Sequence, residues 1–108
     1  MLVRGLDMKK IINKKMYNTE TASFIGSDSY SFPDDFRWWE ENLYRKYTGE
    51  FFLFGKGGPL SPYSKRIGQH KRIGDKKIIP LSTDDAMQWV ECHLDTDTYE
   101  ELFGQVEE

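Results

Sequence analysis

The sequence has one cysteine and no long apolar run, and each shortage excludes a class of protein. Cys92 alone can form neither an internal disulfide nor a zinc site of four cysteines, which suits a reducing compartment. No stretch approaches the ~18 consecutive apolar residues that span a bilayer, and the N-terminus has no secretory pattern. We therefore expect a cytoplasmic protein that makes no contact with a membrane.

Lys and Arg are missing from the C-terminal quarter of the chain. All 15 lie within residues 1–80, where nine acids leave a net charge of +6, whereas residues 81–108 carry nine acids and a charge of −9. This asymmetry favours a charged macromolecule as the partner. A solvated helical face whose charge has no function would give the same count, so this alternative stays open.

The length and composition predict one folded domain. A chain of 108 residues suffices for a single hydrophobic core, and an aromatic content of 15% argues against disorder. We place this domain at residues 8–108. Residues 1–7 precede a second methionine, Met8, and are interpreted as a disordered extension or a cloning remnant.

Two β-hairpins and an edge strand are predicted. The first hairpin spans residues 9–17 and turns at Asn13, a residue type that tolerates the left-handed conformation. The second spans residues 43–54, where two aromatic runs flank Gly49. A short strand near residues 76–80 ends in a proline, which suits the edge of a sheet.

The segments around these strands are harder to assign. The first arm of the second hairpin extends back through Phe36, Trp38 and Trp39, or residues 34–42 form a helical turn after Pro33, and both alternatives stay open. Gly55–Pro59 is expected to end the second arm. Residues 19–26 are expected to form a short helical turn that stops at Gly26, and residues 27–35 a loop.

The C-terminal segment has the signals of two helices. Ser82 and Asp85 form a capping box, and the residues that follow place Ala86, Trp89, Val90 and His93 on one face. Asp95 or Thr96 caps a second helix that stops at Gly104. Burial of Trp89 and Phe103 would stabilise the fold by roughly 1.5–3 kcal/mol each. The predicted class is α+β, with a small antiparallel sheet packed against this helix pair.

Acidic residues follow the outward side of both predicted helices. A rigid helix pair of this kind could present charge as a nucleic-acid backbone does, and so occupy a basic groove of a protein. The candidate partner-binding residues are Asp84, Asp85, Glu91, Asp95, Asp97, Glu100 and Glu101.

A basic segment over residues 65–77 repeats Lys-Arg-Ile-Gly at a spacing of six residues and is expected to form a long loop. Its cations could neutralise phosphates, and a tyrosine nearby could stack on a base. The alternative, a solvated surface loop without a binding function, fits the sequence about as well. The candidate nucleic-acid contacts are Tyr63, Lys65, Arg66, Lys71, Arg72, Lys76 and Lys77.

Other short motifs do not predict chemistry. Gly55-Lys56-Gly57-Gly58 lacks the Lys-Ser/Thr ending of a phosphate loop and is interpreted as a turn. His93 lies on the apolar helix face beside Cys92, so we expect a core histidine with one hydrogen-bond partner. No nucleophile, base and charge stabiliser occur at motif spacing, so we predict no enzyme activity, metal or cofactor.

The order of the motifs resembles a family of small proteins carried by mobile elements of Firmicutes. The resemblance covers residues 8–104 and rests on eight blocks: Lys9–Asn13, Tyr17–Ala22, Leu43–Lys46, Thr48–Leu53, Gly57–Pro59, Ile78–Ser82, Trp89 and Tyr99–Glu101. Members of this family look like anti-CRISPR inhibitors of type II RNA-guided nucleases.

The resemblance implies a stoichiometric inhibitor in the cytoplasm of a bacterial host cell. Its partner would be a type II CRISPR nuclease, with guide RNA as a second candidate partner. It would block guide-RNA loading, target-DNA binding or a conformational step of the nuclease. No catalytic motif of the family maps onto this chain. The basic segment departs from the pattern of the family, which keeps a nucleic-acid-binding module open as the alternative function.

Overall fold

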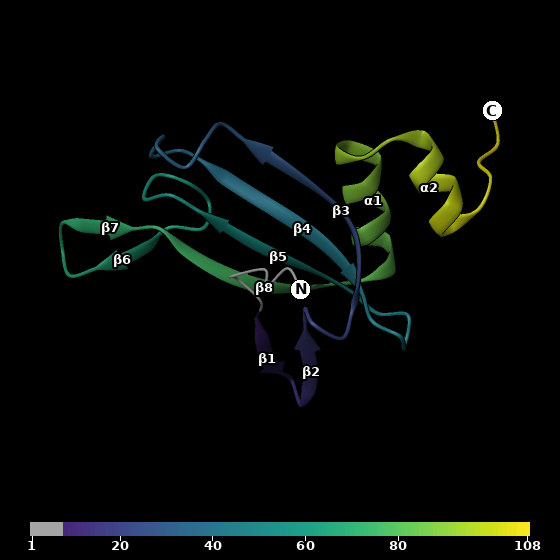
Figure 1. Ribbon diagram of the computed structural model, residues 1–108, viewed down its shortest axis with the longest axis horizontal. Helices are drawn as coiled ribbons and strands as arrows, with labels where there is room; N and C mark the ends of the chain where they lie inside the picture. Colours follow the sequence, from purple (N-terminus) through teal and green to yellow (C-terminus); the bar gives the residue numbers. More distant parts are fainter. Residues whose placement is uncertain (1–7) are drawn as a thin grey trace.

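The computed structural model describes residues 8–108 and arranges them in three layers (Figure 1). The middle layer is an antiparallel sheet of four strands in the order β3-β4-β5-β8. Its strands are β3 (Ser23–Tyr30), β4 (Trp39–Arg45), β5 (Phe51–Gly57) and β8 (Asp75–Leu81). The predicted α+β class is therefore confirmed, and β8 is an edge strand as expected.

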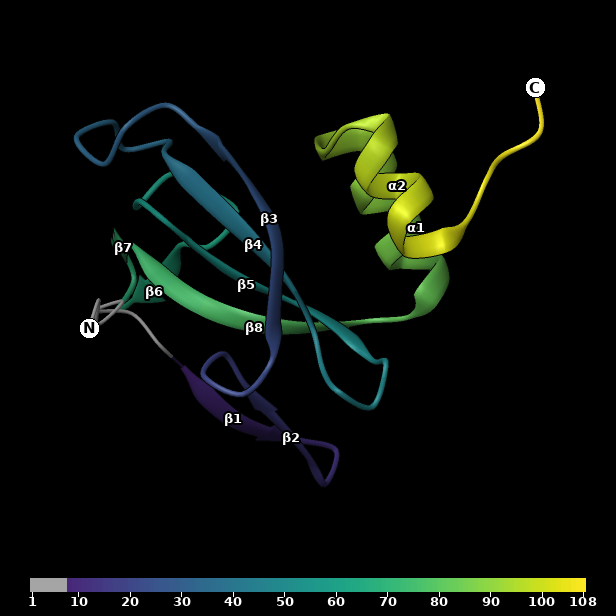
Figure 2. The same cartoon turned by 45° about the vertical axis from the view of Figure 1, so that its right-hand side comes forward.

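The two outer layers cover opposite faces of this sheet (Figure 2). One is the hairpin of β1 (Lys9–Ile12) and β2 (Lys15–Asn18), and the other is the pair α1 (Thr83–His93) and α2 (Thr96–Phe103). The first predicted hairpin is thus confirmed. Its turn residues Asn13 and Lys14 have φ of 51° and 67°, as a two-residue primed turn requires.

Alternation along β4 and β5 gives the molecule two hydrophobic cores. Leu43 and Leu53 point toward α1, where they meet Trp89 and Val90. The neighbouring side chains point to the other face, where Tyr44, Phe52 and Phe54 pack with Tyr17 of β2 and Ile78 of β8. Because successive strand residues alternate between faces, the second predicted hairpin supplies both cores.

Residues 19–26 do not form a helical turn that stops at Gly26, and residues 27–35 are not all loop. A single turn closes early, where the Ala22 N–H donates to the Asn18 carbonyl over 3.1 Å, and β3 then runs from Ser23 to Tyr30. Gly26 lies inside this strand, where a Cβ would come within 2.9 Å of the Leu94 side chain. The glycine permits close packing and does not end a helix.

The glycines after Phe54 do not end β5 either. The strand continues to Gly57, and Gly55 pairs with Glu41 of β4 and with Lys77 of β8. A Cβ at Gly55 would overlap the ring of Tyr63, so glycine is needed for packing here. Of the two alternatives for the first arm, the structure has the strand, but this strand begins at Trp39 and leaves Phe36 and Trp38 in the connection before it.

Both helices begin and end as their sequences indicate. The Ser82 hydroxyl accepts the N–H of Asp85 at 3.0 Å, and the Asp95 carboxylate accepts the N–H of Thr98 at 2.8 Å. Gly104 follows α2 with φ of 93°. Within residues 8–108, no helix combines the length and apolar character needed to cross a membrane.

Candidate functional site

Five of the seven predicted acidic residues lie together at the end of the molecule formed by the helices. Glu91, Asp95 and Glu100 line a shallow groove of about 420 Å³ together with Leu94 and Tyr99. Glu100 also lines a second, more open depression with two further acids, Asp97 and Glu101. Because Glu100 is common to both, the five carboxylates form one surface, which we call the acidic face.

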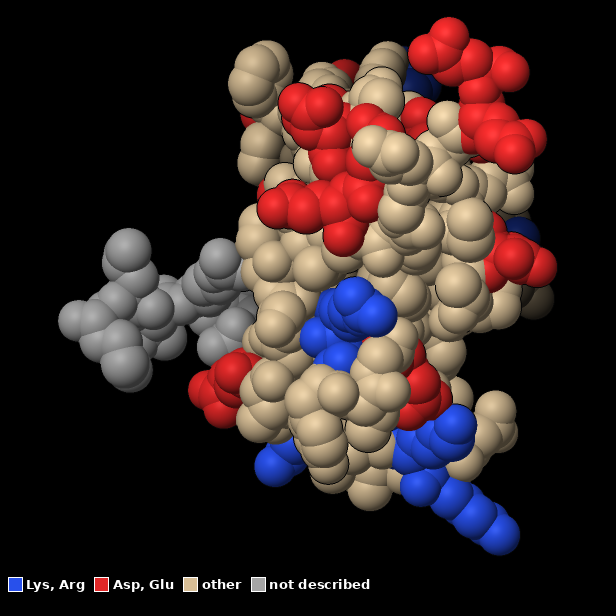
Figure 3. Space-filling model, turned by 90° about the vertical axis from the view of Figure 1, so that its right-hand side faces the viewer, with Lys and Arg blue, Asp and Glu red and all other residues tan. Residues whose placement is uncertain are grey.

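The other two predicted acids, Asp84 and Asp85, line neither groove, because they lie in the first turn of α1. There they complement the positive end of the helix dipole. Figure 3 looks onto this end of the molecule and shows carboxylates gathered over the helices, with the foremost Lys and Arg side chains below them.

The electrostatics of the acidic face are those of open surface carboxylates. None of its five residues forms an ion pair with a cation of residues 8–108. The pKa of Asp95 is lowered, chiefly by the hydrogen bond from Thr98 to its carboxylate. Asp95 therefore stays ionised below the ordinary range of an aspartate, and it caps α2 while contributing charge to the face.

The basic segment is a β-ribbon and not the long loop that its sequence predicts. β6 (Lys65–Ile67) and β7 (Lys71–Ile73) pair as a separate two-stranded sheet, and Gly68 with φ of 65° begins the turn between them. The two Lys-Arg-Ile repeats thus face each other across one hairpin. Lys76 and Lys77 lie in the adjoining part of β8 and are exposed.

Tyr63 is not available as a nucleic-acid contact. It is only 8% exposed, and its hydroxyl donates to the Glu41 carboxylate over 2.5 Å. Burial raises the pKa of the Tyr63 hydroxyl above its ordinary range, and the bond to Glu41 acts in the same direction. The prediction that its ring stacks on a base is wrong, because that ring packs over Gly55.

A polar network that the sequence did not predict joins β3 and β4 to α1. Glu41 also accepts the indole N–H of Trp89 at 2.8 Å, and Asp28 lies 2.8 Å from Nδ1 of His93. Asp28 and Glu41 are opposite one another on β3 and β4. His93 is half-buried, has Asp28 as its hydrogen-bond partner and stacks on Trp89, which largely agrees with the predicted core histidine. The hydrogen bond from His93 lowers the pKa of Asp28.

This network holds α1 against the sheet and does not resemble a metal centre. Within residues 8–108, no three His, Cys, Asp or Glu side chains are placed to bind a metal ion together. Cys92 is exposed and carries a free thiol. Only pairing across strands brings Asp28, Glu41 and His93 together, so no spacing in the sequence could have identified them.

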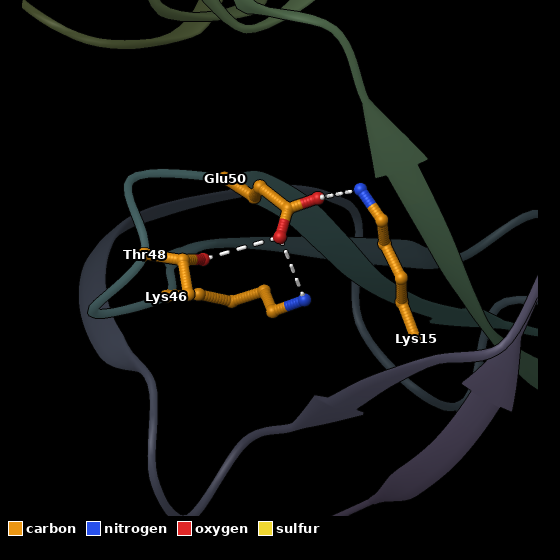
Figure 4. Close-up of polar contacts among 4 residues, drawn as sticks. All are labelled: Lys15, Lys46, Thr48 and Glu50. Carbon is orange, nitrogen blue, oxygen red and sulfur yellow. Dashed lines mark hydrogen bonds and ion pairs between the residues drawn. The ribbon is translucent and has the colours of Figure 1, made fainter.

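A second polar cluster joins the β1–β2 hairpin to the turn between β4 and β5 (Figure 4). The Glu50 carboxylate contacts Lys15 at 2.8 Å and Lys46 at 3.1 Å, and it accepts the hydroxyl of Thr48. These contacts lower the pKa of Glu50 to about 2, with the Lys15 hydrogen bond as the largest cause. Lys46 also lies over the ring of Tyr17, so the cluster fixes the hairpin on the sheet.

No protein-family model matches the chain, and comparison with curated proteins and with solved structures gives no significant match.

Proposed function

We propose that this chain is a protein inhibitor of a type II RNA-guided CRISPR nuclease, and that it acts by stoichiometric binding. Its contact surface is the acidic face. The observation that carries the proposal is the gathering of five carboxylates on two helices, with no ion pair to a cation of residues 8–108.

The chemistry of the partner follows from this charge. A guide-loaded nuclease holds its nucleic acid in a positively charged channel, and the protein reads the backbone of the duplex there. A surface of closely spaced carboxylates competes for the same Lys and Arg side chains. The inhibitor would therefore block either guide-RNA loading or target-DNA binding, in agreement with the family that the motifs resemble.

The rigidity of the helices favours the acidic face as the contact surface. Side-chain hydrogen bonds cap both helices, and α1 is anchored in the core by Ala86, Trp89 and Val90. The backbone of the face is thus ordered before binding. A preordered surface loses less conformational entropy on docking than a flexible loop does.

Charge reversal on the acidic face tests the proposal. The double variant Glu91→Lys/Glu101→Lys changes two exposed side chains that cap neither helix. In a DNA-cleavage assay with a purified type II nuclease, we expect the wild-type chain to inhibit at about one molecule per nuclease. The variant should lose inhibition, and wild-type association should slow as salt rises because steering is screened.

The matched control is Glu20→Lys, which makes the same charge change as Glu91→Lys alone at an exposed acid outside both the acidic face and the β3–β4 connection. This control should inhibit as the wild-type chain does. Pull-down with and without guide RNA then shows which form of the nuclease is captured. Equal potency of E91K/E101K and wild type would exclude the acidic face, and failure to capture either form would exclude the nuclease.

A further inference from the structure

The β6–β7 ribbon has an arrangement of charge that a purely structural hairpin would avoid. Arg66 and Arg72 are directly opposite each other, so both guanidinium groups lie on the same face of the ribbon. Like charges opposite one another destabilise a strand pair, and a short two-stranded ribbon is marginally stable by itself. An anion bound between the two arginines would remove this repulsion.

The positive charge of the ribbon is not neutralised by carboxylates of residues 8–108. None of the six cations of residues 65–77 forms an ion pair with a carboxylate of residues 8–108. The Arg72 guanidinium instead donates two hydrogen bonds to the Ser64 hydroxyl, which is neutral. These bonds orient Arg72 and leave its charge uncompensated, so the ribbon presents fixed positive charge.

Exposed aromatic side chains lie at the same end of the molecule. Phe32 is 75% exposed and Phe36 is 67% exposed, and both belong to the connection between β3 and β4. Figures 1 and 2 show this connection and the β6–β7 ribbon at the end away from the helices. These two phenylalanines gain little from folding, and their rings offer apolar faces on which a ligand can stack.

Backbone contacts connect the aromatic connection to the base of the ribbon. The Leu60 N–H donates to the Phe36 carbonyl at 2.8 Å, which holds that connection against the turn after β5. On the other side of this turn, Gly74 lies so close to the Gly57 carbonyl that no Cβ would fit. One short turn therefore separates the phenylalanines from the strand that carries Arg72.

We propose that this end of the molecule binds single-stranded nucleic acid, with phosphates at Arg66 and Arg72 and bases stacked on Phe32 and Phe36. A positively charged track beside exposed aromatic rings is the arrangement by which proteins hold single strands without reading sequence. The proposal concerns a different surface from the acidic face and does not rest on it.

A single strand fits this surface better than a duplex. A two-stranded ribbon can enter the major groove of DNA, but paired bases are stacked on each other and offer no free face to a phenylalanine. In a single strand the bases are free to stack on protein rings, as in RNA loops and ends. Only an unpaired strand would use the ribbon and the aromatic rings together.

Fluorescence anisotropy with a labelled 20-nucleotide RNA of mixed sequence, free of secondary structure, tests the site. The wild-type chain should bind in low salt. Arg66→Gln/Arg72→Gln should lower the slope of log affinity against log salt by about 1.4, for two phosphates at about 0.7 each. Phe32→Ala/Phe36→Ala should weaken binding roughly ten-fold or more while leaving that slope unchanged.

The matched control is Lys9→Gln/Lys10→Gln, which removes two exposed cations from β1 and should bind as wild type does. Thermal melting shows whether each variant is folded. The proposal is overturned by absence of binding in low salt, by equal affinity of the phenylalanine variant and wild type, or by tighter binding of the same sequence as a duplex.

Discussion

At the scale of single residues, Gly55 decides how the turn after β5 packs. The Tyr63 ring occupies the space that a Cβ at Gly55 would need. We expect Gly55→Ala to lower the free energy of unfolding by about 1–3 kcal/mol, the usual cost of overpacking a filled core. Urea denaturation measures this loss, which would lower the melting temperature by several degrees.

A double-mutant cycle separates this clash from a general effect of alanine in a strand. In a Tyr63→Ala background the three atoms nearest the added methyl group, all from Tyr63, are gone, so the cost of Gly55→Ala should fall toward zero. An unchanged cost in that background would show that the contact between residues 55 and 63 does not explain the glycine.

Glu50 provides a test of pH dependence at a single carboxylate. Its pKa falls from an ordinary 4.5 to about 2 in the folded chain, so its ion pairs stabilise the fold above about pH 4.5. This stabilisation is lost as the pH falls through 4.5 toward 2. The difference in urea midpoint between wild type and Glu50→Gln should therefore be present at pH 7 and shrink by pH 2.

High salt should reduce the same difference at pH 7, because the pair with Lys15 is exposed to solvent and is therefore screened. Glu20→Gln is the control, since Glu20 is exposed and pairs with no cation of residues 8–108. A pH profile of Glu50→Gln parallel to that of wild type would contradict the assignment.

At the scale of elements, Glu41 joins β4 to α1 and to the turn that carries Tyr63. Its two oxygens accept the indole N–H of Trp89 and the hydroxyl of Tyr63. Glu41→Ala leaves both donors without their partner in a largely buried position. Each orphaned group costs about 1–3 kcal/mol, so we expect a loss of several kcal/mol in urea denaturation.

Its neighbour Glu40 is the natural control, because it points to the opposite face of the same strand. It pairs with Lys56 at 3.5 Å and accepts the side-chain amide of Asn42 at 3.0 Å, and its own side chain is 32% exposed. A partly exposed ion pair contributes less than the hydrogen bonds of a buried carboxylate. Glu40→Ala should therefore lower stability clearly less than Glu41→Ala does. If both substitutions have the same effect, the network beneath α1 does not contribute to stability in the proposed way.

At the scale of the whole molecule, charge is separated along the longest dimension, which is 49 Å. The acidic face lies at one end and the β6–β7 ribbon at the other (Figure 1). The Debye length is about 8 Å in 0.15 M salt and about 30 Å in 0.01 M salt. The two ends should therefore be independent in physiological salt and influence each other only in dilute buffer.

This separation predicts how variants at one end affect the other. In 0.15 M salt, E91K/E101K should leave RNA affinity unchanged, and R66Q/R72Q should leave the association rate with the nuclease unchanged. In 0.01 M salt, E91K/E101K should strengthen RNA binding, because it removes long-range repulsion of phosphate. Strong coupling in physiological salt would mean that both ligands contact one continuous surface.

Local chemistry in the sequence determined the helices and the hairpins. Capping by Ser82 and Asp95, the glycine after α2, and positive φ at Asn13 depend on residues within one turn of each other. Such interactions are present in the sequence whatever the rest of the chain does. The segregation of charge was likewise visible from the sequence alone.

Tertiary structure decided the rest, because the deciding contacts join residues far apart in the chain. From the sequence, Gly26 was expected to end a helical turn and Gly55 to end a strand. Both lie inside strands, where Leu94 packs against Gly26 and Tyr63 packs against Gly55. Tyr63 is buried and so cannot contact a base, whereas Phe32 and Phe36 are exposed. Local propensity cannot anticipate which surfaces long-range packing will cover, and that packing set the positions of both proposed binding surfaces.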